Sequence, residues 1–211
     1  GSLGSFIHKL MFIWIAFLAL AFLKEKIKQI FFAGALAVLI GNWLLLKVSV
    51  GALGIGHIMI LAATLFWAVE NILSKQLINK GTSPLMVIWS RMTFGSVFIA
   101  LYLFARGSAF SHTDFPASLI PWTLATGCLL TGYVFTWYYG LKKIPVTLAS
   151  IILLLGSPIT SLLDFFFSGK VLIGGQILGI VLLVIGVGIT CYFYIATLKS
   201  ANNVAHHGST A

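Results

Sequence analysis

The sequence has very little charge. Only 8% of its 211 residues are charged, and four of these are acidic against thirteen lysines and arginines. With 60% hydrophobic residues and a mean hydropathy of +1.07, too little polar surface remains to cover a soluble domain. The composition therefore predicts a multi-pass membrane protein whose first partner is the lipid bilayer.

Groups that would indicate a metal or a cofactor are scarce as well. The two cysteines, Cys128 and Cys191, lie inside apolar runs without the spacing of metal ligands, so we expect no disulfide, metal site or cofactor. The net charge of +9 would suggest nucleic acid in a soluble protein. Here the basic residues lie mostly between apolar runs, where they set membrane orientation, and we expect no nucleic-acid partner.

The sequence also lacks the elements of the common membrane enzymes and pumps. Asp164 is the one aspartate in an apolar run, whereas an intramembrane aspartic protease needs two. There is no Gly-x-Ser-x-Gly element for a serine nucleophile and no Gly-Lys-Ser/Thr loop for ATP phosphates. We therefore predict that the chain is not an enzyme.

Long apolar runs dominate what is present. A membrane span needs about 20 apolar residues, and seven stretches satisfy this. We place them at residues 6–23, 29–47, 57–79, 84–105, 118–140, 146–168 and 172–195. The expected fold is an all-α membrane protein with about seven transmembrane helices and a polar tail over 196–211.

The lysines predict which way the spans cross. One side of the membrane would hold Lys24, Lys26, Lys28, Lys75, Lys80, Lys142, Lys143 and Lys199. The other side would hold Lys9, Lys47, Arg106 and Lys170. The positive-inside rule then places the C-terminus in the cytoplasm, in a multi-pass protein of the cell membrane.

Two segments, 21–46 and 165–190, look like copies of one motif. Each joins the last turn of a span to a short basic loop and a glycine-spaced span, and Gly34 and Gly41 recur as Gly179 and Gly186. This spacing indicates an internal repeat. Because five spans would separate the copies, the second would lie inverted in the bilayer, as in many transporters.

The later spans carry a family resemblance. LAATLFWAVENILSKQLI, SPLMVIWSRMTFGSVFIALYLF and GQILGIVLLVIGVGIT resemble the second EamA repeat of the drug/metabolite transporter superfamily. The resemblance implies that 57–195 is a complete second repeat and 1–47 the last two spans of a first repeat. It further implies a ten-helix, 5+5 inverted-repeat fold that lacks its first three spans here. Glu25 matches the family's acidic residue after the fourth span, whereas Gly169 stands where the second acid is expected.

Two ionisable residues within the spans are candidates for function. Glu70 and Arg91 are equidistant from the turn at Lys80 and Gly81, so an antiparallel hairpin would place them at one depth, where they could pair. The pair would either fix the hairpin or bind substrate or protons. We expect Asp164 to be a wetted residue at a loop end.

Polar and aromatic side chains extend this candidate site. Trp67, Glu70, Asn71 and Ser74 share one helical face, which should point into the bundle or a cavity. Trp89 and Tyr138 would add either aromatic walls to the cavity or ordinary packing.

A Gly-Ser-Pro sequence interrupts the sixth predicted span. Gly156, Ser157 and Pro158 should break the helix and free backbone carbonyls, either for substrate or hinge motion or as a static kink. The resemblance strengthens this candidate, since the family commonly has a proline there.

These observations favour a secondary transporter that exports or exchanges a small metabolite such as an amino acid by alternating access. Protons are a candidate coupling ion, and a homodimer or a complementing fragment is a candidate partner. The alternatives are a seven-helix receptor and an inactive transporter fragment. A retinal protein is disfavoured because 172–195 contains no lysine.

Overall fold

The computed structural model describes residues 2–25, 27–48, 54–107 and 117–208, and within these ranges the chain forms helices joined by short turns, with no strand. Lys26, one of the lysines used for the orientation, lies outside the described residues. The predicted fold class, an all-α membrane protein, is confirmed. Among the described residues, five helical stretches are long and apolar enough to cross a bilayer: Ser2–Leu23, Ile55–Asn79, Pro84–Ala105, Val146–Ser168 and Gly174–Ala196.

The other two predicted spans are also helices, but each falls short of a span in one respect. Helix α3, Gln29–Leu45, is apolar but has 17 residues, about 25 Å at 1.5 Å per residue. Helix α6, Ile120–Lys143, has 24 residues, but four threonines lower its hydropathy. Five of the seven predicted spans thus meet both conditions.

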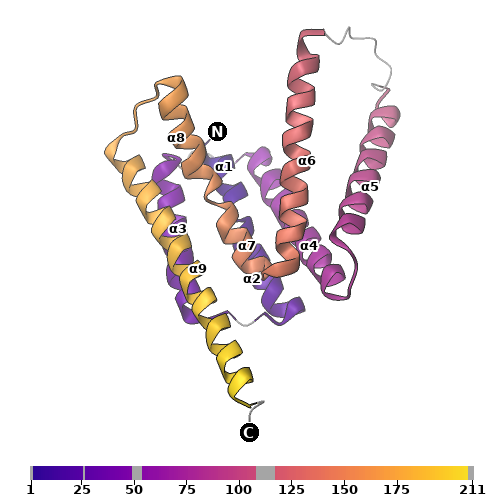
Figure 1. The fold of residues 1–211 in the computed structure, drawn as a ribbon. Helices are drawn as coiled ribbons and strands as arrows, with labels where there is room; N and C mark the ends of the chain where they lie inside the picture. The colour runs from indigo at the N-terminus through magenta and orange to yellow at the C-terminus, as the bar shows by residue number, and fades with distance from the viewer. Residues whose placement is uncertain (1, 26, 49–53, 108–116, 209–211) are drawn as a thin grey trace. The chain divides into compact units, whose positions relative to one another are not determined.

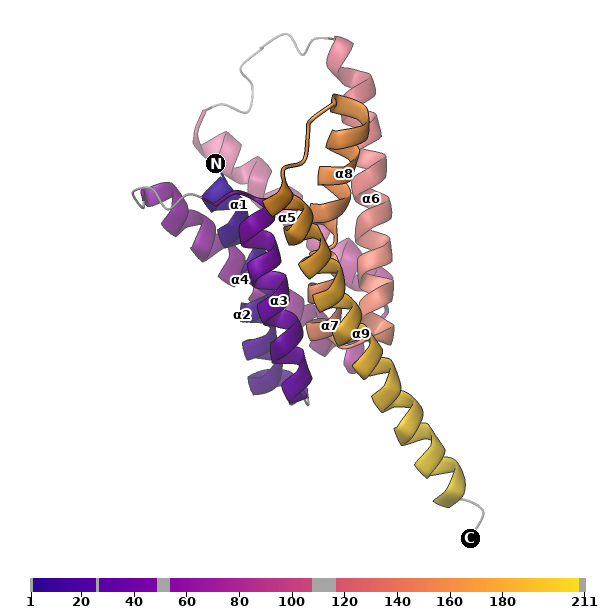
Figure 2. The same cartoon turned by 90° about the vertical axis from the view of Figure 1, so that its left-hand side faces the viewer.

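The chain forms two compact units, which are described separately. The first contains residues 1–72 and 145–211, and the second contains residues 73–144. The first unit is built from α1 (Ser2–Lys9), α2 (Met11–Leu18), the π-helical turn η1 (Ala19–Leu23), α3, most of α4 (Ile55–Asn79), α7 (Val146–Leu153), α8 (Gly156–Ser168) and α9 (Gly174–Gly208). These helices can be followed in Figures 1 and 2.

Helices α3 and α9 pack closely side by side (Figures 1 and 2). Gly34 meets Gly186, and Gly41 meets Gly179, so the two helices run antiparallel. A Cβ atom on any of these glycines would lie 2.7 or 2.8 Å from a backbone carbonyl oxygen of the facing helix. Only glycine allows such an approach of two backbones, as at close helix crossings in membranes.

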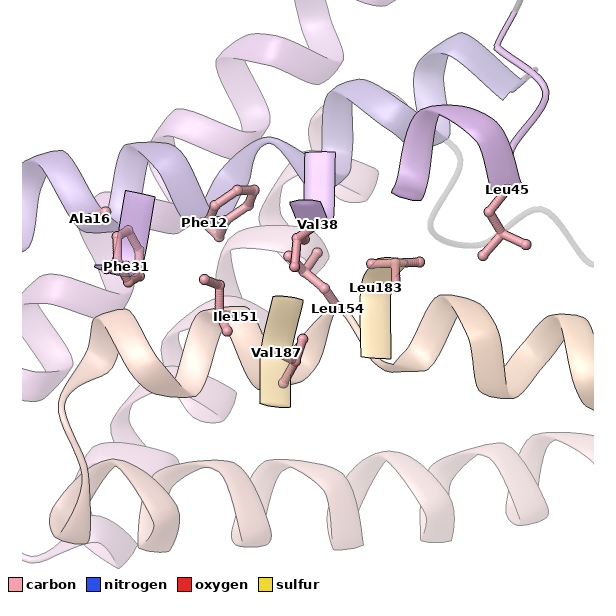
Figure 3. Packing of buried hydrophobic residues seen from close by; sticks show 9 residues of the cluster. All are labelled: Phe12, Ala16, Phe31, Val38, Leu45, Ile151, Leu154, Leu183 and Val187. Carbon is pink, nitrogen blue, oxygen red and sulfur yellow. The ribbon is translucent and has the colours of Figure 1, made fainter. Parts of the chain in front are cut away.

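Apolar side chains from four helices form the core of this unit (Figure 3). Val38 of α3 and Leu183 of α9 are fully buried between the glycine contacts. Around them lie side chains from α2, α3, α7, α9 and the segment after α7: Phe12, Ala16, Phe31, Leu45, Ile151, Leu154 and Val187. The core thus joins both predicted repeat copies.

The two copies share their backbone geometry at a constant offset of 145 residues, the separation of Gly34 from Gly179. Helix α3 starts at Gln29 and α9 at Gly174. The helix break at Leu10 corresponds to the break at Leu155. The span before each loop ends on a left-handed residue, Lys24 with φ 53° and Gly169 with φ 65°.

The caps of these spans match as well. The Glu25 N–H donates to the Ala19 carbonyl at 3.2 Å, and the Lys170 N–H donates to the Asp164 carbonyl at 3.4 Å, each a six-residue closure of a helix C-terminus. This register corrects the expectation that Gly169 stands at the place of the second acidic residue. Gly169 corresponds to Lys24, so the residue at the place of Glu25 is Lys170.

The second unit contains the end of α4, α5 (Pro84–Ala105), the 3-10 turn η2 (Ala117–Leu119) and α6. Gly81, with φ 97°, allows the turn after α4, and the Ser83 hydroxyl then accepts the Met86 N–H at 3.2 Å. Many large apolar side chains of α5 and α6 are exposed: Trp89, Phe94, Phe98, Trp122, Leu124 and Leu129 among them. Such faces suit lipid.

The last helix is longer than the sequence predicts. The apolar span ends at Ala196, one residue beyond the predicted end at 195, but α9 continues as a helix through the polar tail to Gly208. Alanines in this stretch favour helix, and no proline interrupts it.

Candidate functional site

Asn71 and Ser74 of helix α4 are buried together with Ala68 and Ile72, whereas most of the large apolar side chains of this helix are exposed. Asn71 is 1% exposed and its Nδ2 donates to the Trp67 carbonyl at 2.8 Å, while Glu70 is half-buried. Phe66, on another face, is 76% exposed. This is the arrangement expected of a span whose polar face lines the protein interior.

Within the first unit, Trp67 also contacts α1. Its ring centroid lies 5.3 Å from that of His8, with the ring planes tilted by 53°. His8 and Lys9 line a cavity with Gly4, Ser5 and Ile60, so the α1–α4 boundary is hollowed near this aromatic pair. The predicted stripe therefore begins near an open hollow that His8 and Lys9 help to line.

In the second unit, Arg91 of α5 and Tyr138 of α6 interact directly. The Arg91 Nη1 donates to the Tyr138 hydroxyl at 2.8 Å, and the guanidinium carbon lies 5.8 Å from the ring centroid. Tyr138 is fully buried and Arg91 is half-buried. A guanidinium has a planar fork of N–H donors that matches the geometry of a carboxylate. Trp89, the other predicted wall residue, is 68% exposed.

The predicted Glu70–Arg91 pair stays a prediction. Glu70 belongs to the first unit and Arg91 to the second, so the two units each carry one half of it.

Lys75 is a polar residue whose place the sequence did not reveal. We used it with Lys80 to orient the third predicted span, 57–79, near whose end it lies, but its side chain is buried, with the residue 7% exposed inside α4. Its Nζ donates to the carbonyl oxygens of Leu141 and Ile144, the latter at 2.9 Å. A buried ammonium at this position caps the C-terminal end of α6, where helix carbonyls lack partners.

The predicted interruption of the sixth span is present. Helix α7 ends at Leu153 and α8 begins at Gly156, with the N–H groups of Leu154, Leu155 and Ser157 each bonded three residues back. Pro158 and Ser157 lie in the first turn of α8, and both are buried. The Ser157 hydroxyl has no hydrogen-bond partner among the described residues. A buried, unengaged hydroxyl beside a helix break is a candidate ligand contact.

Glu25 joins the loop after η1 to the start of α7. Its carboxylate accepts the Val146 N–H at 3.0 Å, the Thr147 N–H at 3.4 Å and the Thr147 hydroxyl at 2.5 Å. Pro145 precedes this turn, so the carboxylate satisfies the first free donors of α7 and meets the positive end of its dipole. The family resemblance marked Glu25, but its partner 121 residues away could not be read from the sequence.

Asp164 lies near the other end of α8. It is 41% exposed and pairs with Lys170 at 2.6 Å across the helix end. Within the described ranges, no group of three or more histidine, cysteine or acidic side chains is placed to hold a metal ion. Glu70, Asn71, Arg91, Tyr138 and Ser157 stay predicted contacts for a substrate or a coupling ion.

The comparisons with known proteins bear on what these residues do. No curated protein matches the chain. The EamA-like transporter family matches it over residues 54–196, a range that covers well over half of the chain and encloses residues 57–195. Together with its apolar helices, this match shows that the chain belongs to the EamA-like transporter family.

Proposed function

We propose that the protein is a secondary transporter that exports or exchanges a small metabolite, such as an amino acid, by alternating access. The observation that carries the proposal is the antiparallel α3–α9 pair, whose glycine contacts, helix starts and left-handed caps repeat at a 145-residue offset. Two copies packed in opposite senses are what an inverted-repeat transporter requires.

The candidate substrate contacts of the first unit are the inward face of α4 and the break before Ser157 and Pro158, and those of the second unit are Arg91 and Tyr138. Arg91 would bind a carboxylate or another acceptor, and Trp67 would offer an aromatic wall. Glu70 would pair with Arg91 when the site is empty, or carry a coupling proton. The break between α7 and α8 would serve as the hinge for the change of access.

Orientation and partners belong to the same proposal. The lysine distribution supports a cytoplasmic C-terminus, and the proposed location is the cell membrane. The exposed apolar side chains of α5 and α6 are available to lipid, to a second copy of the chain or to a complementing polypeptide. A receptor with seven helices would need none of the repeat geometry.

Flux in proteoliposomes tests the proposal. Purified chain reconstituted in vesicles should move radiolabelled amino acids, and an imposed proton gradient should change the rate. The same assay is run with the chain alone and with a second polypeptide that covers the remaining spans of the fold. If these compounds bind in both kinds of vesicle but are not transported in either, a receptor is favoured.

A further inference from the structure

A cavity of about 320 Å³ opens within the first unit, where the start of α3, the start of α7 and the later part of α9 meet. Its walls are largely apolar and include Ile27, Ile30, Phe31, Leu148 and Phe193. The volume is at the lower end of the range for small-molecule sites. Glu25 and Lys28 also line the cavity, and neither belongs to the proposed transport site.

The two ends of the α3–α9 pair differ in how the helices are joined. At the far end, the Gln176 Nε2 donates to the Leu45 carbonyl at 3.2 Å and joins the first turn of α9 to the last turn of α3. At the offset of 145 residues, Gln176 corresponds to Phe31, and Leu45 corresponds to Thr190. Phe31 and Thr190 line the cavity, so a hollow replaces the hydrogen bond at this end.

The length of α9 adds to the difference. Phe193 and Tyr194 form part of the cavity wall, whereas Val48, the counterpart of Phe193, comes after the end of α3 at Leu45. The cavity therefore depends on a feature that the second copy has and the first lacks. The packing of α3 against α9 does not by itself require a cavity at this end.

The charges at the cavity favour an anion. The Glu25 carboxylate is engaged by the first turn of α7, whereas the Lys28 side chain is exposed. In the described part of the chain, no hydrogen bond or ion pair involves the Lys28 ammonium. Lys24, in the same loop, is exposed as well.

We propose that this cavity binds an anionic phospholipid, with an acyl chain among the apolar side chains and the phosphate against Lys28. The site lies at the ends of membrane-crossing helices, where headgroups meet protein. Basic residues next to a span attract anionic lipids, and aromatic residues such as Tyr194 suit the interface. The apolar walls contribute through burial of the acyl chain.

Native mass spectrometry of the purified full chain tests this proposal, with phosphatidylglycerol or phosphatidylcholine added to the detergent solution. We expect the wild type to retain phosphatidylglycerol preferentially. Lys28→Gln should reduce that retention about fivefold, the effect of one lysine near a lipid surface, and should reduce retention of phosphatidylcholine less, because its headgroup has no net charge. Lys80→Gln removes an exposed lysine from the other unit and should retain the lipid as the wild type does.

A second variant tests the apolar part. Ile30→Trp, or Ile27→Trp if the first variant does not fold, should fill the cavity and reduce retention of both lipids. Excess inorganic phosphate should not displace phosphatidylglycerol, because the acyl chain also binds. The proposal is wrong if Lys28→Gln behaves like Lys80→Gln, if folded tryptophan variants keep the lipid, or if phosphate displaces it completely.

Discussion

Gly186 and Gly34 are in backbone contact: a Cβ atom on Gly186 would lie 2.7 Å from the Gly34 carbonyl oxygen. The reciprocal contact, from Gly34 to the Gly186 carbonyl, would be 2.8 Å. Because real Cβ atoms do not approach backbone oxygens so closely, the α3–α9 pair can adopt this packing only with glycine at both positions.

Replacing Gly186 should therefore loosen the pair. Gly186→Ala forces the helices apart, and we expect a loss of about 1–3 kcal/mol in stability, as for overpacked cores. Thermal unfolding in detergent measures the change. Gly188→Ala is the matched control, since Gly188 lies in the same helix and has open space at its Cβ position. Equal melting temperatures for the two variants would rule out the close contact.

Glu25 should stabilise the start of α7. Glu25→Ala removes the acceptor of two N–H groups and one hydroxyl, and we expect a loss of about 0.5–2 kcal/mol, as for a helix cap. Thr147→Val should lose part of the same stabilisation, and the two changes together should cost less than their sum. Asp164→Asn, at an exposed ion pair, should change the melting temperature little. Full additivity of Glu25→Ala and Thr147→Val would contradict a shared cap.

Lys75 should be required for the end of α6. Lys75→Met keeps the side-chain volume but leaves the carbonyls of Leu141 and Ile144 without their donor, at a cost of about 1–3 kcal/mol for unsatisfied buried groups. Hydrogen exchange at the end of α6 should accelerate in this variant. The exposed Lys80, changed to Met, serves as the comparison and should leave that exchange unchanged.

Arg91 should be required for transport. Arg91→Ala should abolish flux in proteoliposomes, and Tyr138→Phe should reduce it, because the phenylalanine keeps the ring but loses the 2.8 Å hydrogen bond. Arg106→Ala is a close control, since Arg106 also lies 5.8 Å from a tyrosine ring, that of Tyr102, but at the end of α5. Glu70→Gln should likewise abolish flux. Wild-type rates in folded Arg91→Ala protein would remove Arg91 from the site.

The sequence predicts the helices of this protein well because apolar runs and their breaks are local features. The span over 84–105 coincides with α5, and Gly156 and Pro158 mark the break between α7 and α8. The recurring spacing of Gly34 and Gly41 and of Gly179 and Gly186 marks the residues at which α3 and α9 meet, and the burial of Asn71 and Ser74 follows from helical periodicity.

What the sequence does not predict depends on contacts between distant segments. Nothing local to Glu25 indicates Thr147 as its partner, and the lysine content of a loop does not reveal that Lys75 turns inward to cap α6. No glycine or proline marks the helix break at Leu10. The break is recognised only because it corresponds to the break at Leu155.

The central claim is that the two copies cross the membrane in opposite senses. Cysteine accessibility measures this directly: in a background without Cys128 and Cys191, Lys24→Cys and Lys170→Cys place single thiols at exposed positions of the two corresponding loops. With a membrane-impermeant maleimide applied to sealed cells, Lys170→Cys should be labelled, and Lys24→Cys should be labelled only after the membrane is opened. Labelling of both thiols from the same side would contradict the inverted repeat and, with it, the transporter proposal.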